Sequence, residues 1–257
     1  MSSVKISAVI ITFNEERNIS RCIDSLQDVV DEILVVDSYS KDKTKQICLE
    51  KGVTFMEHAF EGHIQQKNWA KGQAKFDHVL SLDADEALSE ELKDSIKQIK
   101  MQFIEDGYSF NRLTNYCGKW IKHCGWYPDV KLRLWDRNKG KWTGVNPHDK
   151  FELNQGCKSH HLKGDLLHYS YYTIDDHLNQ YNKFTTIGAA ESFKRGKSIS
   201  VGGILVKTIW KFVRDYFIKA GILDGYYGFV ISANSAHATF TKYVKLKELN
   251  KNAKKKQ

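Results

Sequence analysis

The chain has 257 residues, of which 41% are hydrophobic and 27% charged, and this composition is typical of a globular protein with a full core. Its formal charge is +8, but residues 242–257 hold seven lysines and one glutamate, so the body is nearly neutral. A neutral body argues against a nucleic-acid-binding domain. The five cysteines form no Cys-x-x-Cys pair and the N-terminus carries no signal sequence, which predicts a cytoplasmic protein without a disulfide framework.

The first hundred residues alternate short apolar runs with helical patterns. Asn14 is expected to cap a helix that follows the first strand at once. Strands are expected at 6–12, 32–37, 53–56 and 76–82, and further helices at 44–51, 64–71 and 92–103. This alternation predicts an α/β fold with an open, doubly wound sheet, in which ligands bind at the carboxyl ends of the strands.

Polar side chains stand at the ends of these strands: Thr12, Asp37, Asp83 and Asp85. Asp83 and Asp85 are two residues apart, so in an extended segment both carboxylates point the same way. Two hard oxygen ligands suit Mg²⁺ or Mn²⁺ and leave other positions for substrate phosphates. An Asp-x-Asp pair on its own is more often a solvated turn, and the surrounding pattern must decide.

The pattern changes after Gly107. Residues 108–113 are a strand candidate, and 130–134 read as a half-exposed strand with Lys131 and Arg133 on its polar side. The aromatic and basic segment between them, 118–128, suits a core or a ligand platform equally well. Residues 163–169 form another strand candidate, which contains His168.

Two helical regions are expected at the C-terminal end. Thr173 and Asp176 form a capping box that starts a helix to about residue 193. Residues 199–220 are apolar and aromatic with a basic stripe, yet no uncharged run reaches the ~18 residues of a membrane span. They suggest a helix that covers the sheet or one that lies on a membrane surface. We expect a catalytic domain at 1–195 and a helical, aromatic-basic extension with a solvated Lys-rich tail at 196–257.

Six segments carry motifs that follow one another along the chain: Ile11 to Ile19, Val35 to Asp42, Gln66 to Asn68, Leu80 to Glu86, Gly125 to Asp129, and His148 with Asp149. Together and in this order they resemble one known family, the family 2 inverting glycosyltransferases with the GT-A fold, in the WaaE/KdtX-like branch of lipopolysaccharide core enzymes. The resemblance implies an open, doubly wound mixed sheet flanked by helices, with a helical C-terminal extension.

The resemblance also implies the site residues. The nucleotide-sugar-binding residues would be Thr12, Glu15, Asp37, Lys67, Asp83 and Arg133. The metal ligands would be Asp85, Asp83 and His168. Asp149 would be the catalytic base, although the family usually has His-Glu where this chain has His148-Asp149. A turn cap for Asp37, a surface role for Lys67 and a core role for His168 remain the alternatives.

The implied reaction moves a sugar from a nucleotide diphosphate sugar, expected to be a UDP-sugar, to a hydroxyl of a glycan or lipid-linked glycan. Mg²⁺ or Mn²⁺ would neutralise the diphosphate, and a carboxylate base would deprotonate the acceptor, which attacks from the opposite face. An anionic membrane surface is a further expected partner because of the basic tail together with the aromatic-apolar segment before it.

Three other functions share parts of this pattern. A sugar nucleotidyltransferase needs a glycine-rich loop after the first strand, and residues 12–17 contain no glycine. A phosphatase of the Asp-x-Asp type carries that motif on its first strand, whereas here it follows the fourth. A non-catalytic nucleotide-sugar-binding protein remains open, because the residues alone do not show turnover.

Overall fold

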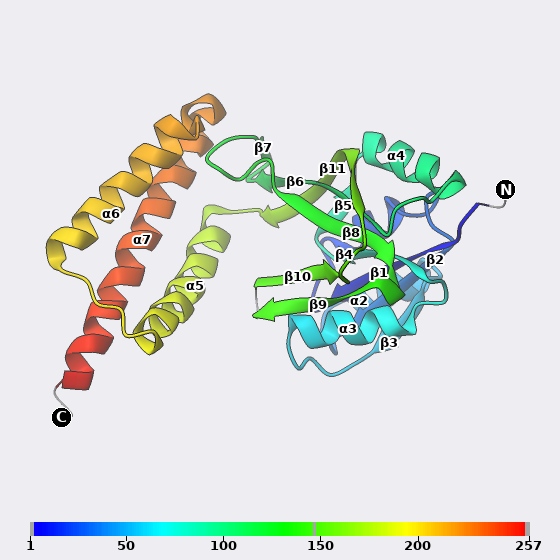
Figure 1. Ribbon diagram of the computed structural model, residues 1–257, viewed down its shortest axis with the longest axis horizontal. Coiled ribbons are helices and arrows are strands. Elements are labelled where there is room, and N and C mark those ends of the chain that lie inside the picture. The colour runs from blue at the N-terminus through cyan, green and yellow to red at the C-terminus, as the bar shows by residue number, and fades with distance from the viewer. Residues whose placement is uncertain (1–2, 146–147, 255–257) are drawn as a thin grey trace. The chain divides into compact units, whose positions relative to one another are not determined.

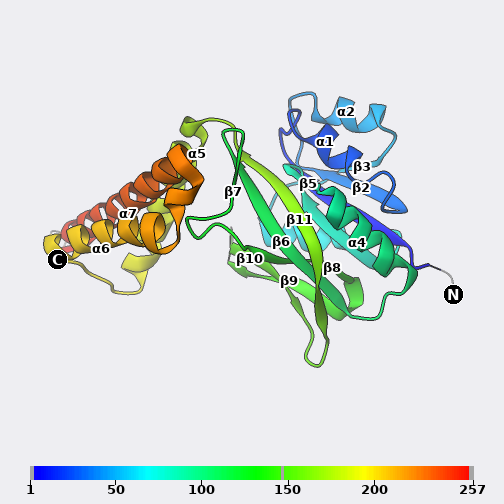
Figure 2. The same ribbon diagram turned by 90° about the horizontal axis from the view of Figure 1, so that it is seen from above.

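The computed structural model describes residues 3–145 and 148–254, and Figures 1 and 2 label its elements. The strands are β1 (Ile6–Thr12), β2 (Glu32–Asp37), β3 (Thr54–Glu57), β4 (His78–Asp83), β5 (Glu86–Leu88), β6 (Gly107–Tyr116), β7 (Lys119–Ile121), β8 (Val130–Asp136), β9 (Gly140–Val145), β10 (His148–Leu153) and β11 (Ser159–Tyr171). The helices are α1 (Ile19–Asp24), α2 (Thr44–Glu50), α3 (His63–Gln73), α4 (Glu90–Met101), α5 (Ile174–Lys194), α6 (Val201–Val213) and α7 (Gly225–Lys254). Short turns of other helix types are η1 (Arg137–Lys139), η2 (Arg214–Ile218, a π-helix) and η3 (Gly221–Asp224).

The main sheet is mixed and has the strand order β3-β2-β1-β4-β8-β6-β11-β5, with β7 paired to β6. The strands β3, β2, β1 and β4 run parallel, whereas β8 is antiparallel to both of its neighbours. A separate antiparallel hairpin consists of β9 and β10. The predicted open mixed sheet flanked by helices, with a helical C-terminal extension, is confirmed.

Apolar side chains cover both faces of the parallel part of the sheet. Alternate residues of one strand therefore serve different cores. In β1, Ile6, Ala8 and Ile10 belong to one buried cluster, which also takes in side chains of α1, α2 and α4. Val9 belongs to the other, which takes in α3 and the aromatic residues Trp135, Trp142 and Phe151. Burial on both faces explains why these strands read as continuous apolar runs.

The segment after β1 differs from the prediction. Asn14 does not cap a helix, because α1 begins only at Ile19. Instead Asn14 lies in the left-handed region, with φ at 55°. Its side-chain oxygen accepts from the backbone N–H of Lys41 at 2.8 Å, and its own N–H donates to the hydroxyl of Ser40 at 2.7 Å. The residue thus joins the loops that follow β1 and β2.

The chain folds as two compact units. The first comprises residues 1–113 and 129–169, and the second 114–128 and 170–257. Residue 195, where the sequence suggested a domain boundary, lies directly after α5 in the second unit. There α7 packs against α5 and α6. The capping box of Thr173 and Asp176 is confirmed. The expected Lys-rich tail is helical as far as it is described, because residues 242–254 belong to α7 and residues 255–257 lie outside the described part of the chain.

An aromatic cluster fills the core of the second unit. Tyr116 and Ile121 are fully buried, and Trp126 packs against Tyr116 with ring centroids 5.8 Å apart. Trp126 of the 118–128 segment is therefore part of a core. His177 of α5 is buried in the same cluster, and its Nδ1 lies 3.0 Å from the Tyr116 hydroxyl.

This histidine makes stability depend on pH. Burial disfavours the charged imidazole and lowers the pKa of His177 from 6.5 to about 4. The unfolded chain then binds more protons than the folded one, so stability is lost as pH falls from 6.5 towards 4. Between about pH 7.5 and about pH 5, we expect His177 to cost about 2 kcal/mol of unfolding free energy. Urea unfolding monitored by circular dichroism at both pH values gives the loss of unfolding free energy for each protein. In His177→Gln that loss should be smaller by about 2 kcal/mol. An equal loss in both proteins would contradict the assignment.

Candidate active site

The ends of β1 and β2 lie side by side, because Thr12 pairs with Asp37 in the parallel register. Asp37 is buried, and one of its carboxylate oxygens accepts from the backbone N–H of Ser40 at 2.7 Å. The other accepts from the Ser40 hydroxyl, so Asp37 does form the turn cap that the sequence left open. Thr12 is buried too, and its hydroxyl has no partner among the described residues.

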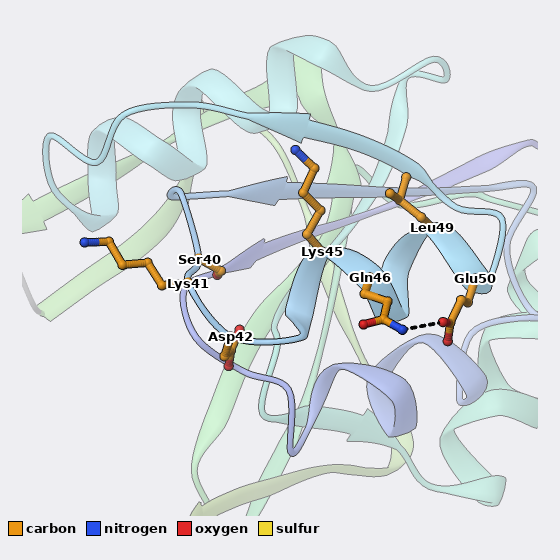
Figure 3. A pocket seen from close by; sticks show the side chains of 7 residues that line it. All are labelled: Ser40, Lys41, Asp42, Lys45, Gln46, Leu49 and Glu50. Atoms are coloured by element: carbon orange, nitrogen blue, oxygen red, sulfur yellow. Dashed lines mark hydrogen bonds between the residues drawn. The ribbon is translucent and has the colours of Figure 1, made fainter.

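A surface hollow of about 460 Å³ lies beside this turn (Figure 3). It is lined by Ser40, Lys41, Asp42, Lys45, Gln46, Leu49 and Glu50. Gln46 and Glu50 are joined by a side-chain hydrogen bond of 2.8 Å. None of the site residues predicted from the sequence lines this hollow, so we place the candidate active site elsewhere.

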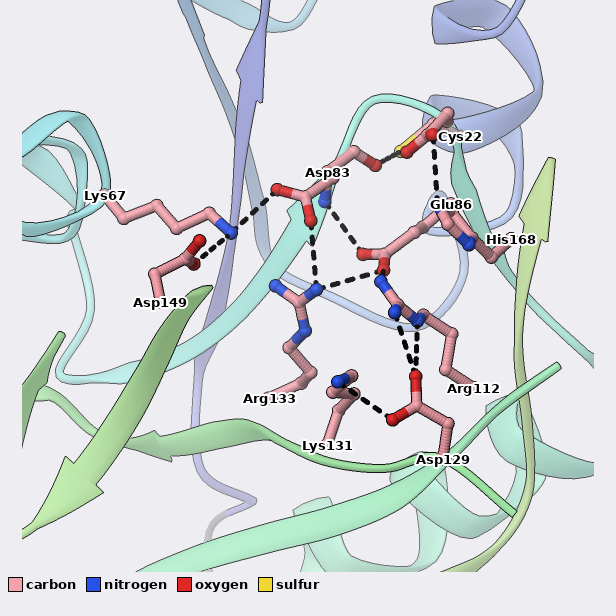
Figure 4. A network of polar contacts seen from close by, with 11 residues as sticks. Cys22, Lys67, Asp83, Glu86, Arg112, Asp129, Lys131, Arg133, Asp149 and His168 are labelled. Carbon is pink, nitrogen blue, oxygen red and sulfur yellow. Dashed lines mark hydrogen bonds and ion pairs between the residues drawn. The ribbon is translucent and has the colours of Figure 1, made fainter. Parts of the chain in front are cut away.

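The carboxylate of Asp83, at the end of β4, lies between two cations (Figure 4). One oxygen is 2.9 Å from the ammonium of Lys67 and the other is 3.0 Å from the guanidinium of Arg133. Burial alone would raise the pKa of Asp83, but the charges of Lys67 and Arg133 outweigh it and hold the pKa well below its usual value. Asp83 is therefore an ionised carboxylate with both oxygens engaged.

Lys67 also reaches Asp149, whose carboxylate is 2.8 Å from the same ammonium. The neighbouring Asn68 explains how Asp149 comes so close. Its side chain accepts from the backbone N–H of Trp142 at 3.0 Å and donates to the Trp142 carbonyl at 2.9 Å. These two bonds fasten β9 to α3, and β10 carries Asp149 beside it. The Lys67 ammonium lies 4.5 Å from the centre of the Trp142 ring.

Arg133 differs from its prediction, because it does not lie on an exposed side of β8. It is only 4% exposed, and Trp142 lies near its guanidinium at 5.6 Å. Burial would lower the pKa of Arg133, but the carboxylates of Glu86 and Asp83 outweigh this and raise it. One terminal nitrogen of Arg133 bonds to both carboxylates at 3.0 Å. The other has no hydrogen-bond partner in the described part of the chain.

Glu86 is a site residue that the sequence reasoning left without a role. Its carboxylate is buried, accepts from the backbone N–H of Asp83 at 2.9 Å and from Arg133 at 3.0 Å. Arg112 lies 3.6 Å from the same carboxylate. Glu86 therefore orients both the end of β4 and the guanidinium of Arg133. The only sequence signal for this role was its place directly after the Asp83-Ala84-Asp85 motif.

Asp85 lies in the turn between β4 and β5 and faces a different partner. Its carboxylate is 3.1 Å from Nε2 of His168, and its backbone carbonyl accepts from the Tyr169 N–H at 2.9 Å. Burial would raise the pKa of Asp85, but His168 outweighs it and lowers the pKa. Glu15 lies in the same acidic surroundings, since burial and the charges of Asp85, Asp42 and Asp83 raise its pKa.

These contacts test whether a divalent metal ion fits. Within residues 3–145 and 148–254, no group of three or more His, Cys, Asp and Glu side chains is placed to hold an ion. Asp83 already uses both oxygens on cations. Asp85 and His168 offer one carboxylate and one imidazole, a pair that fits an ion whose remaining ligands come from a diphosphate and water.

The role of Glu86 can be tested through stability. In Glu86→Gln the buried Arg133 keeps only Asp83 as a charged partner, so we expect a loss of about 2 kcal/mol in the free energy of unfolding. Asp129→Asn is the matched control, because Asp129 also pairs with an arginine but is partly exposed. It should cost no more than about 1 kcal/mol. Equal losses in urea unfolding would show that Glu86 is not a buried structural anion.

Comparison with known proteins identifies the family of the chain. A family model described as "Glycosyl transferase family 2" matches residues 7–101, from β1 to α4. An uncharacterized glycosyltransferase of Rickettsia typhi is 32% identical over 256 residues, which cover 96% of this chain and 88% of that one. The lipopolysaccharide core biosynthesis glycosyltransferase LpsC of Rhizobium meliloti is 27% identical over 252 residues, 94% of this chain and 91% of LpsC.

Among solved structures, S. aureus TarS 1–349 in complex with UDP-GlcNAc aligns over 97% of this chain and 92% of that one, at 15% identity and a TM-score of 0.48. This likeness is too distant to bear on the site. The sequence relatives decide between the functions that the residues alone left open. Because a glycosyltransferase is 32% identical to nearly the whole chain, the chain belongs to the family 2 glycosyltransferases and is an enzyme of that class.

Proposed function

We propose that the enzyme transfers a sugar, with inversion, from a UDP-sugar to a hydroxyl of a glycan acceptor. The observation that supports this proposal is the position of the Lys67 ammonium, which lies 2.9 Å from the carboxylate of Asp83 and 2.8 Å from that of Asp149. One carboxylate stands at a strand end of the nucleotide-binding sheet, and the other is presented by a separate hairpin. A residue of the sugar-donor side and a residue of the sugar-acceptor side thus contact the same ammonium.

The donor side is built from the strand ends. Thr12, Asp37 and Glu15 bind the nucleoside, while Asp83, Lys67 and Arg133 hold the ribose and diphosphate. Two buried polar groups support this placement, because the Thr12 hydroxyl and one Arg133 nitrogen have no partner within the described residues. An unpaired buried polar group costs free energy, and a bound ligand that pairs it removes that cost.

Asp85 and His168 hold the metal ion. When bound, Mg²⁺ or Mn²⁺ neutralises charge on the diphosphate leaving group. Arg133 adds a fixed positive charge from the protein, which its contacts with Asp83 and Glu86 keep oriented. Asp83 contributes to the metal site by its charge and by its contact with the donor.

Asp149 is the catalytic base. It accepts the proton of the acceptor hydroxyl as that oxygen attacks the sugar from the face opposite the diphosphate. Its side chain is one carbon shorter than the glutamate usual in this family, but β10 brings it to hydrogen-bonding distance of Lys67. Lys67 holds the carboxylate in place, and because it also holds Asp83, base and donor site keep a constant separation.

We further propose that the acceptor is a lipid-linked glycan of the lipopolysaccharide core and that the enzyme works at the cytoplasmic face of a membrane. The name of the relative LpsC, a lipopolysaccharide core biosynthesis glycosyltransferase, supports the acceptor class. Such an acceptor is anchored in a bilayer, so the enzyme must reach it from the surface.

The donor proposal is tested with a panel of UDP-, GDP- and CMP-sugars, with and without Mn²⁺. We expect metal-dependent binding and slow hydrolysis of a UDP-sugar by the wild-type enzyme. Asp85→Asn should lower hydrolysis by roughly 100-fold, because it removes the carboxylate that holds the ion against the diphosphate. It should retain its fold by circular dichroism. Full wild-type activity in excess EDTA would refute metal dependence, and preference for another nucleotide would refute the uridine assignment.

The base is tested separately from donor binding. Asp149→Asn should bind UDP-sugar as the wild-type enzyme does, while its transfer rate falls roughly 10²- to 10⁴-fold, the usual contribution of a general base. Glu152→Gln, three residues along the same strand and partly exposed, is the matched control and should transfer normally. If Asp149→Asn transfers at the wild-type rate, the base is another residue. It is then Glu152 if the Glu152→Gln control has lost transfer, and Asp129 is the next candidate if that control transfers normally.

A further inference from the structure

We propose that the second unit binds the surface of an anionic lipid bilayer through an apolar face on α6, η2, η3 and the start of α7. The apolar face is defined by large side chains that are about half exposed or more. They are Val201, Leu205, Val206, Ile209, Trp210, Phe217, Ile218, Ile222, Leu223, Tyr226 and Phe229.

The spacing on α6 places these side chains on one side of the helix. Val201, Leu205 and Ile209 follow one another at four-residue intervals, and Val206 and Trp210 form a second row beside them. Ile204, by contrast, is buried. α6 packs against α7, so it is an amphipathic helix whose outer side is apolar, the property of helices that lie in the interface of a bilayer.

Along residues 192–247, which contain the apolar face, the exposed Lys, Arg, Asp and Glu side chains are of one sign. Residues 192–247, all of them described, contain two acids, Asp215 and Asp224. Both are buried, at 2% and 4% exposure. Asp215 is paired with Lys211 at 2.7 Å and Arg214 at 2.9 Å. The second unit therefore presents no exposed carboxylate along this stretch.

Asp224 is engaged inside the protein as well, since its carboxylate lies 3.0 Å from Nδ1 of His123 and accepts from the His123 backbone N–H at 2.8 Å. Two cations are not buried in this way: Lys207 and Lys219 are exposed beside the apolar side chains. An apolar face with exposed cations and no exposed anions is complementary to an anionic leaflet, where each lysine contributes about 1 kcal/mol.

The proposed contact is made by the apolar face on the outside of the protein, and it involves no membrane-spanning helix. In the described part of the chain, no helix is long and apolar enough to cross a membrane. The face includes the aromatic-apolar segment that the sequence suggested, whereas the Lys-rich segment is part of α7 and one of its lysines is used internally. Lys245 bonds to the Thr185 and Thr186 hydroxyls of α5 at 3.0 and 2.8 Å.

This inference concerns binding to lipid alone. The further idea that the same bilayer holds the glycan acceptor rests on the proposed function. A glycosyltransferase whose acceptor is lipid-linked gains from such a face, because the acceptor is then always within a small volume near the enzyme.

The test is co-sedimentation of the full chain with vesicles of phosphatidylglycerol and phosphatidylcholine, or of phosphatidylcholine alone. We expect binding to the anionic vesicles only, with release as salt rises. The double variant Val206→Glu and Leu223→Glu, at positions 67% and 68% exposed, should bind at least about tenfold more weakly. The matched control Met101→Glu and Ile104→Glu, on the first unit at 63% and 71% exposure, should bind like the wild type.

Fluorescence quenching by brominated lipid locates the contact. Trp210 is 54% exposed on the apolar face, so quenching should be strong in the wild type and largely lost in Trp210→Phe. Equal binding to neutral vesicles, or an equal loss in the control pair, would overturn the proposal. A lipid-free dimer that the Val206→Glu and Leu223→Glu pair disperses would also overturn it and assign the face to a second copy.

Donor hydrolysis measured on the same samples separates the two proposals. The Val206→Glu and Leu223→Glu pair should lose lipid binding and keep hydrolysis, because the candidate active site lies in the first unit. Vesicle binding by an enzyme that hydrolyses no nucleotide sugar would overturn the proposed function and support the surface.

Discussion

The ammonium of Lys67 is the contact on which the rest of the site depends. It lies between two carboxylates that would repel each other without it, and it is almost completely buried. Asp83 comes from the main sheet and Asp149 from a two-stranded hairpin, which is marginally stable by itself. The hairpin is held by the two bonds of Asn68 and by the packing of Trp142 and Phe151 in the core. Placement of Asp149, the proposed base, is thus a consequence of core packing.

Charges of opposite sign alternate outward from Lys67. Asp83, Arg133, Glu86, Arg112 and Asp129 follow one another, each within 3.6 Å of the next (Figure 4). Alternation makes burial of several charges tolerable, because each ion has a partner on both sides. It also orients the guanidinium of Arg133, and one of its nitrogens remains without a partner among the described residues. In the second unit, burial of Asp215 and Asp224 has a different result, since it removes their negative charge from the surface beside the apolar face.

Local sequence patterns predicted much of the fold. β1 and β2 end at Thr12 and Asp37 as the apolar runs predicted, because burial on both faces leaves a continuous hydrophobic signal, and β4 ends at Asp83, one residue after its predicted end. The capping box of Thr173 and Asp176 was equally readable, since both partners lie within one turn. Family membership followed from short motifs in a fixed order, and sequence relatives confirm it. Properties that depend on neighbours along the chain were therefore open to prediction.

Tertiary structure decided the rest, because the partners are far apart in sequence. Lys67 and Asp149 are 82 residues apart, and no local pattern shows that one ammonium serves both Asp149 and Asp83. Arg133 alternates with apolar residues like an exposed side chain, yet Trp142 and two carboxylates enclose it. Glu86 acquired its role only when β8 brought Arg133 beside it. Sequence by itself determined which residues stand at the strand ends. Long-range packing decided which of them meet, because the ion pairs of the site join segments that are far apart in the chain and that only the folded core brings together.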